Sequence, residues 1–453
     1  MALFAPKSKM LDVSMTAIVD NLIFSKTNVW AGYRMESSMY DFIGAEGRIK
    51  DAANVADVMR TLMEDRAEKL DIQVVSTTTP IDVEAWEAMV ESVSEFWGTP
   101  KTFDVYLERM ANYLRSEAYA RKVVYFFVDL GRRRALDTSG LNPLEHGVKD
   151  AFATLKEWGS MAVRPIAEEI SVAEERRWRQ AEESIRRVIG TGLTVQPMQA
   201  DEPLLLVKRS LYPAMEVPYL DIDHEHRLNA GDLEMEYASV IINHYRALEF
   251  RQMVGNDEVT GFRATVSLNK FPKVSTYPYS AAPFLYLPHQ KGYPLTVWAR
   301  LSLIPSEKMR KEVGKKQAEM ADQVKNKGAG AMTADDVVAS DDGDNEAIQD
   351  ARDMADMTQR DRTPWVEGSY HVVVEAPTMK GVRDMAQEIK KMYSNIGINS
   401  VLTAGDQKEL FLSQMPADKL RVSSFKQVTN LNAFAASGFN LGGEVGDLFP
   451  ESD

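Results

Sequence analysis

The chain has 453 residues, enough for two to four domains of about 150 residues each, and 44% of them are hydrophobic, as sizeable cores require. It contains no cysteine, which excludes disulfides, thiolate zinc sites and cysteine-held iron–sulfur clusters. The net charge of −14 makes nucleic acid an unlikely main partner, because proteins that bind nucleic acid along their length carry a basic field. The longest apolar run, Val123–Val128, is far shorter than the roughly 20 residues of a membrane helix, and no signal-peptide pattern opens the chain. We therefore expect a cytosolic protein.

Residues 1–135 are predicted to form a first α+β domain. Two β-rich runs separated by a polar turn, Asn21–Phe24 and Val29–Met35, predict a hairpin. Apolar residues at helical spacing follow, and then a strand at Leu70–Ser76. After two further helical segments, the run Lys122–Asp129 is short and β-branched enough to be a central strand.

Residues 136–260 are predicted to be a helical and irregular connecting region. A heavily charged helical segment is interrupted at Pro165, and its interleaved Glu and Arg residues are typical of a solvated helix face. Pro197–Tyr219 is punctuated by prolines and should be irregular or short-helical, and Asp232–Phe250 is mixed in character. A strand at Gly261–Leu268 and a proline-rich strap then lead into the next domain.

Residues 261–437 are predicted to form a second α+β domain around the strand Leu295–Ile304, whose apolar residues alternate at period two. Pro305 occupies a natural first helical position, and a long helical hairpin over 305–362 should project as an arm because its apolar stripe is thin. Within it, glycines and clustered aspartates predict a disordered loop at 325–345. A strand at Tyr370–Glu375, a helix with an apolar stripe from Val382 to Ile396 and a short strand complete the unit.

The predicted fold is thus α+β, with two ferredoxin-like subdomains joined by helical and proline-rich segments and a helical hairpin inserted in the second sheet. The glycine-rich, acidic end, 438–453, should be a linker toward a further domain.

No catalytic or cofactor site is predicted in this chain. A phosphate-binding loop needs the spacing GxxxxGK[ST], but the only Gly-Lys pair, Gly314-Lys315, lies inside a predicted helix and lacks the earlier glycine. His224 and His226 beside Asp221 and Asp223 are the only cluster of metal-ligand residue types, and no third ligand stands at a familiar spacing. We therefore predict no metal site, and an enzyme with a site around His224 is kept only as an alternative.

A candidate docking patch consists of Arg132, Arg133 and Arg134, directly after the predicted central strand. Three adjacent guanidiniums on an acidic protein can bind phosphate groups or an acidic partner. The competing interpretation is a solvated turn.

Several stretches in order along the chain resemble the N-terminal part of the type IV secretion ATPases of the VirB-four/TraC/TraE kind. They are Val29–Arg34, Leu70–Val75 with Pro80 and Trp86, Tyr119–Tyr125, Gly261–Phe271, Leu295–Arg300, Phe411–Pro416 with Arg421, and Thr429–Phe434. In that family an ATPase domain with Walker motifs follows the region matched here. ATP and magnesium are therefore expected only in a following domain.

The resemblance implies a docking and assembly region of a conjugative or type IV secretion motor, at the cytoplasmic face of the bacterial inner membrane. It implies inner-membrane channel proteins as partners, self-association as a hexamer and peripheral membrane contact. The alternative is a stand-alone scaffold protein of a secretion or phage-like assembly.

Overall fold

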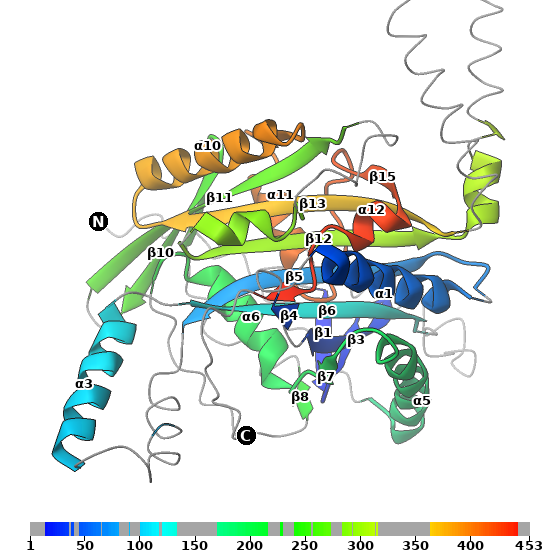
Figure 1. Ribbon diagram of the computed structural model, residues 1–453, viewed down its shortest axis with the longest axis horizontal. Helices are drawn as coiled ribbons and strands as arrows, with labels where there is room; N and C mark the ends of the chain where they lie inside the picture. Colours follow the sequence, from blue (N-terminus) through cyan, green and yellow to red (C-terminus); the bar gives the residue numbers. More distant parts are fainter. Residues whose placement is uncertain are drawn as a thin grey trace, which may run out of the picture.

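The computed structural model describes residues 14–35, 38–39, 45–64, 66–80, 90, 100–116, 120–133, 170–215, 227–229, 240–254, 257–272, 283–291, 293–312, 314–315 and 363–442. In these residues the chain is a mixed α+β protein built on one large antiparallel sheet (Figure 1). The predicted α+β class is confirmed; the ferredoxin-like pattern stays a prediction.

The sheet of the described residues has fourteen strands. They are β1 (Met15–Val19), β2 (Leu22–Ser25), β3 (Asn28–Met35), β5 (Leu70–Pro80), β6 (Ala120–Arg132), β7 (Val195–Pro197), β8 (Arg227–Asn229), β9 (Val240–His244), β10 (Ala247–Val254), β11 (Asp257–Lys270), β12 (Leu295–Ile304), β13 (Trp365–Ala376), β14 (Asn399–Leu402) and β15 (Gln427–Asn430). The order is β8-β1-β2-β3-β6-β5-β12-β13-β11-β10-β9, and β7, β14 and β15 pair with β3, β11 and β13. A separate parallel pair joins β4 (Ser38–Met39) to β16 (Leu441–Gly442).

Strands from both predicted domains belong to this one sheet. Strand β5 pairs with β12 from Leu70↔Leu303 to Thr77↔Thr296, so the two predicted units are joined by backbone hydrogen bonds. Strands β9 and β10 lie within the region predicted to be helical and irregular. In β10 Glu249 and Arg251 alternate with the buried Leu248 and Phe250, a period-two strand pattern that sequence reasoning missed.

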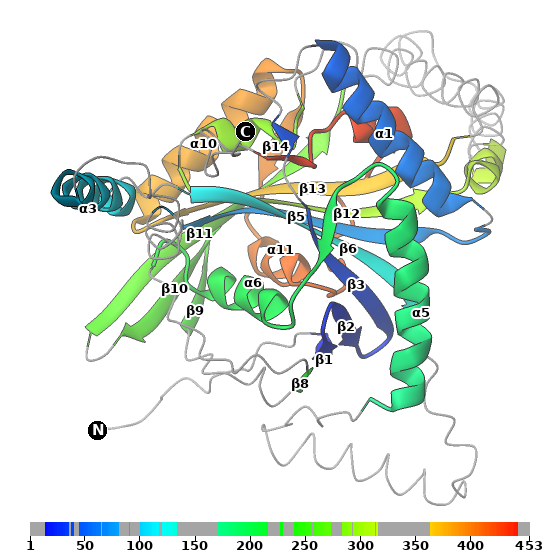
Figure 2. The same ribbon diagram turned by 60° about the horizontal axis from the view of Figure 1, so that its bottom comes forward.

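The sheet is strongly curved, as Figure 2 shows. Strands β8 and β9 lie at opposite ends of the strand order, yet only residues 230–239 connect them. That connection reaches at most about 40 Å, whereas the same strands in a flat sheet would lie about 48 Å apart. The chain therefore requires the two edges to bend toward each other.

Helices cover both faces of the curved sheet. The described helices are α1 (Ala45–Met63), α3 (Pro100–Ser116), α5 (Val172–Ile189), α6 (Asp201–Leu211), η3 (Leu287–Lys291), α10 (Met379–Asn395), α11 (Gln407–Gln414) and α12 (Leu431–Ala435), and α3 lies to one side of the sheet (Figures 1 and 2). The convex core contains residues of α1, α5, α10 and α12, and the concave core contains residues of α6 and α11 (Figure 2). None of the described helices has the length and apolar character needed to cross a bilayer.

The alternation predicted for Leu295–Ile304 is present in β12. Leu295, Val297 and Ala299 contribute to the convex core, and Trp298 contributes to the concave core. The helix predicted after Val382 is α10, capped by Thr378, whose side chain accepts a hydrogen bond from the Gly381 amide. Both elements follow from side-chain periodicity, which the sheet and its covering helices bury as predicted.

Candidate docking region

The long insertion between β12 and β13 begins and ends at one place in the sheet. These strands pair from Leu295↔Val374 to Ile304↔Trp365, so residues 305–364 are inserted between two paired neighbours. The structure describes the helical segment 306–312 that follows Pro305, as predicted. Met309 packs against Ile304 and Trp365, which fixes the start of the insertion to the sheet. The rest of the predicted hairpin and its loop at 325–345 lie outside the described residues.

An open hollow of about 710 Å³ lies beside the start and the end of this insertion. Its walls are the end of α1 with the connection to β5, and both ends of the insertion: Arg60, Met63, Glu64, Arg66, Ala67, Glu68, Pro305, Ser306, Glu307, Lys308, Lys311 and Pro364. A typical small-molecule site of this size is lined mainly by apolar and aromatic side chains. This hollow is lined mainly by charged ones, which suits a polar segment of another protein.

The charges of the hollow come from both walls. Arg60, half-exposed, pairs with Asp57 of its own helix. Burial lowers the pKa of Arg66 from its ordinary value, and the nearby Asp129 opposes that shift. Lys308 carries no ion pair within the described part of the chain and Lys311 is exposed, so both are available to an acidic partner.

The arginine patch predicted after β6 is only partly displayed. The Arg133 side chain is 9% exposed, and its Nε lies 3.0 Å from Oε1 of Glu174 in α5. Its guanidinium also covers the Phe24 ring, with 5.5 Å between its central carbon and the ring centroid. Arg133 therefore joins the end of β6 to α5 and β2. Arg132 is exposed, and Arg134 lies outside the described residues. Docking through Arg132, Arg133 and Arg134 stays a prediction.

His224 and His226, with Asp221 and Asp223, lie outside the described residues. Among the residues that the structure describes, no three His, Asp or Glu side chains are grouped as metal ligands.

Sequence reasoning missed a buried polar cluster on the convex face. His289 Nε2 lies 2.8 Å from Ser76 Oγ, and the Lys122 amine donates to the Leu441 carbonyl oxygen. Burial lowers the pKa of Lys122 to about 7 and, with the charge of Lys122, holds the pKa of His289 well below its usual range. The signal for Lys122 was its position: at period two it shares a strand face with Val124 and Phe126. Because the Lys122 amine donates to the Leu441 carbonyl, we assign Lys122 to the attachment of the segment around β16.

Two buried arginines on the concave face each cap a helix. Arg263 Nη1 donates to the Ser210 carbonyl at the end of α6, at 3.2 Å. Arg300 Nη2 donates to the Met415 carbonyl just after α11, at 2.8 Å. Burial lowers the pKa of both guanidiniums to about 10, so both stay charged at neutral pH and stabilise the negative ends of the helix dipoles.

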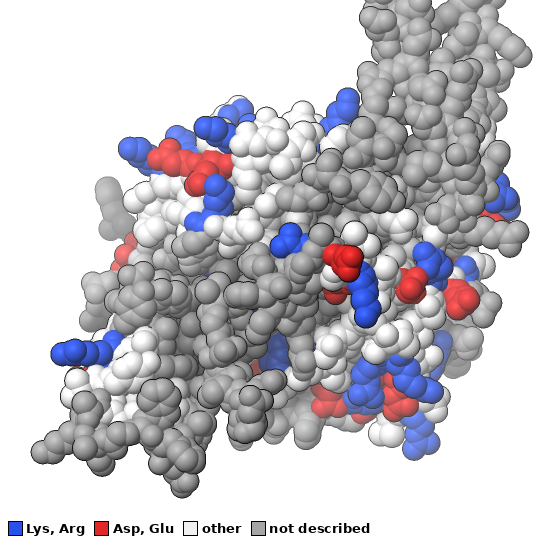
Figure 3. All heavy atoms as spheres, in the orientation of Figure 1, with Lys and Arg blue, Asp and Glu red and all other residues white. Residues whose placement is uncertain are grey.

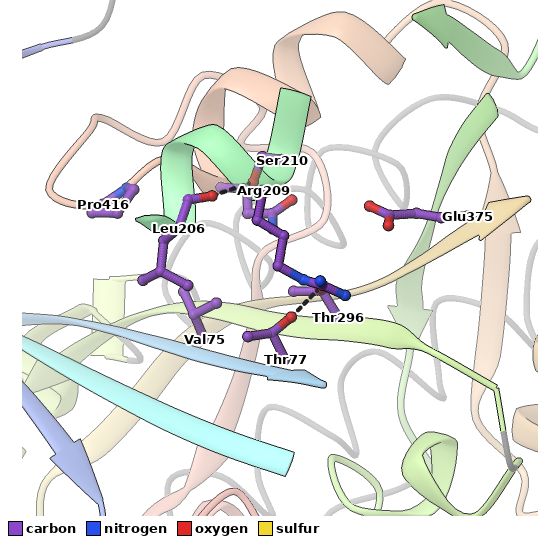
Figure 4. Close-up of a pocket in the computed structure, with 9 residues that line it drawn as sticks. Val75, Thr77, Leu206, Arg209, Ser210, Thr296, Glu375 and Pro416 are labelled. Carbon is purple, nitrogen blue, oxygen red and sulfur yellow. Dashed lines mark hydrogen bonds between the residues drawn. The ribbon is translucent and has the colours of Figure 1, made fainter. Parts of the chain in front are cut away.

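A small pocket lies between α6, the sheet and the end of α11. In Figure 4 the side chains of Arg209 and Glu375 extend into it above a hydrogen-bonded Thr77–Thr296 pair, whose oxygens lie 2.9 Å apart. The space is about 10 Å³, about the smallest that admits a single water. It offers both donors and acceptors, so it suits a bridging water between α6 and the sheet.

The sequence matches no protein-family model and no curated protein.

Proposed function

We propose that this chain is a docking and assembly region of a motor ATPase of type IV secretion, which links a cytoplasmic motor to inner-membrane channel proteins. The observation that carries this proposal is the insertion 305–364. It leaves strand β12 after Ile304 and returns at Trp365, its paired partner in β13, so the ladder between the two strands is complete on either side of it. The charged hollow lies beside the start and the end of the insertion.

The resemblance to the VirB-four/TraC/TraE ATPases adds support. Its stretches are parts of β3, β5, β6, β11 and β12, together with α11 and the β15–α12 segment. Those elements form the centre of one sheet and its covering helices, so the resemblance concerns a connected framework. In this proposal the chain binds and positions partners and self-associates in the motor, while nucleotide chemistry belongs to another domain.

Capture of the channel proteins tests the proposal. The purified full-length chain, immobilised, is expected to retain inner-membrane channel proteins from the same genome. Two variants are compared with the native chain. In one, residues 316–362 are replaced by a short Gly-Ser linker. In the other, Lys308→Glu and Lys311→Glu reverse two charges of the hollow. Both variants should lose capture because they remove the arm or repel an acidic partner.

The control is Arg176→Glu with Arg177→Glu on the exposed face of α5, which changes the net charge equally at a distant site. It should capture as well as the native chain. Undiminished capture by both test variants, with melting curves showing that they are folded, would contradict docking at this region.

A further inference from the structure

Helix α10 carries an unusual charge for a chain of net charge −14. It lies on the convex face, where Val382, Ala386, Ile389 and Tyr393 are buried. Lys380, Arg383 and Lys391 are exposed on the opposite side, and Lys390 is half-buried beside them. Figure 3 shows Lys and Arg side chains over this helix at the upper left of the molecule, around a smaller group of Asp and Glu side chains.

These four cations have no ion pair within the described part of the chain. The helix has two carboxylates, and one of them, Glu388, already has partners: its Oε1 lies 2.8 Å from Lys291 Nζ, and its Oε2 accepts a hydrogen bond from the Tyr293 hydroxyl. Only Asp384 opposes the cations directly. The outer face of α10 is therefore locally cationic and electrostatically unsatisfied.

The face has no apolar anchor. Among the described residues, the large hydrophobic side chains that are exposed all lie outside α10: Ile49, Val105, Tyr106, Val172, Leu205 and Tyr245. A stable protein interface buries aromatic and aliphatic anchors at its centre. A purely ionic face instead suits an extended anionic surface, which attracts it through charge while both keep most of their hydration.

The spacing of the cations is irregular. Lys380 and Arg383 lie near the start of the helix, and Lys390 and Lys391 follow after about 10 Å of helix rise, with Asp384 between the two groups. Charges at fixed spacing on a rigid polyanion meet such a pattern poorly. Lipid headgroups diffuse laterally and can gather under each group of cations.

We propose that the outer face of α10 binds an anionic lipid surface through Lys380, Arg383, Lys390 and Lys391. The contact is electrostatic and acts within a Debye length of about 8 Å at physiological salt. The exposed carboxylates of the net-acidic chain are repelled by the same surface, which favours an orientation with α10 toward the lipid. The inference stands independently of docking to channel proteins.

Vesicle flotation tests the proposal with the full chain. Vesicles of phosphatidylcholine with 30% phosphatidylglycerol are compared with phosphatidylcholine alone, at about 50 and 300 mM salt. The test variant is Lys380→Gln, Arg383→Gln and Lys391→Gln. The control is Arg176→Gln, Arg177→Gln and Arg187→Gln, which removes three exposed cations from α5.

The native chain and the control should bind the anionic vesicles at low salt and detach at high salt. The α10 variant should bind about 100-fold more weakly, which corresponds to about 1 kcal/mol for each cation. Equal loss in both variants, unchanged binding of the α10 variant, or no binding of the native chain would overturn the proposal. Capture of duplex DNA through the same three residues, without vesicle binding, would assign the face to nucleic acid instead. The test contains no channel protein, so its failure leaves the docking proposal unaffected.

Discussion

Lys122 places a primary amine inside the convex core, where it donates to the Leu441 carbonyl and lies 4.9 Å from the centroid of the Tyr286 ring. Burial lowers its pKa to about 7, whereas the unfolded chain has the ordinary value near 10.4. Between these values the unfolded chain binds more protons than the folded one. Stability should therefore rise with pH from about 7 to 10.

Replacing Lys122→Met keeps the aliphatic stem and removes the titrating amine. We expect the native chain to gain up to about 4 kcal/mol between pH 7 and 10 relative to this variant, because three pKa units correspond to that free energy. Urea unfolding at several pH values measures the difference. Lys391→Met, at an exposed amine, is the matched control and should run parallel to the native chain. If the free energy of unfolding of Lys122→Met changed with pH as that of the native chain does, the assignment of this pH dependence to Lys122 would be wrong.

His371 should produce the same dependence of stability on pH, at acid pH. Its ring stacks on Trp298 with centroids 4.0 Å apart, and its nitrogens lie 2.9 Å from Ser267 Oγ and 2.5 Å from Ser369 Oγ. Burial lowers its pKa to about 3, so the unfolded chain binds the extra proton below about pH 6.5. Stability should fall as pH decreases from 6.5 toward 3, and His371→Gln should remove up to about 3 kcal/mol of the fall between pH 6.5 and 4. Denaturation midpoints at pH 4 and 6.5 measure it; an unchanged acid slope in the variant would refute it.

These residues mark the limit of sequence reasoning at the residue scale. The position of Lys122 on an apolar strand face follows from period two, but its partner Leu441 is 319 residues away. Likewise Arg133 stands next to two other arginines, which suggested an exposed patch, while Glu174 approaches it only through the packing of α5. Local pattern identifies which groups are buried or charged, and the tertiary fold alone supplies their partners.

At the scale of elements, periodic segments were predictable and interrupted ones were not. Helix α10 and strand β12 have clear apolar stripes and lie where they were predicted. Helix α6 lies in a segment that was predicted to be irregular or short-helical, and its prolines left its bounds unpredicted. Its Pro203 is the third residue of the helix, where the backbone N–H has no intrahelical acceptor, so the ring is tolerated. A count of the prolines, without their position in the helical turn, left the choice between irregular and short-helical structure open.

The segment that follows α6 crosses strand β11 at Gly261, and this contact gives a prediction at the same scale. A Cβ on Gly261 would lie 1.9 Å from the Pro213 carbonyl oxygen, and that oxygen belongs to the backbone and cannot move alone. Gly261→Ala should therefore lower the free energy of unfolding by about 3 kcal/mol. Gly405→Ala, where a Cβ meets nothing within 4 Å, is the control and should change it little. Urea unfolding measures the free energy of unfolding of both variants. Equal values for the two would mean that α6 shifts freely over the sheet.

At the scale of the whole molecule, the β5–β12 ladder connects what sequence patterns separate into two domains. The two strands pair from Leu70↔Leu303 to Thr77↔Thr296, and Arg300 of β12 donates to the carbonyl oxygen of Met415 behind the sheet. Domain boundaries were drawn from changes in composition, which carry no information about pairing between distant strands. The concave helices α6 and α11 also contribute to one common core that includes residues from both halves.

Unfolding should consequently be a single cooperative transition. Neither half can expose its edge at β5 or β12 without losing the ladder and the buried side chains on both faces, so separation costs nearly as much as global unfolding. We expect one calorimetric peak, with equal calorimetric and van't Hoff enthalpies. Trp298→Ala should lower the free energy of unfolding by about 3–5 kcal/mol and move the whole peak. Two peaks, of which Trp298→Ala shifts only one, would show instead that the halves are separate domains that merely share a strand edge.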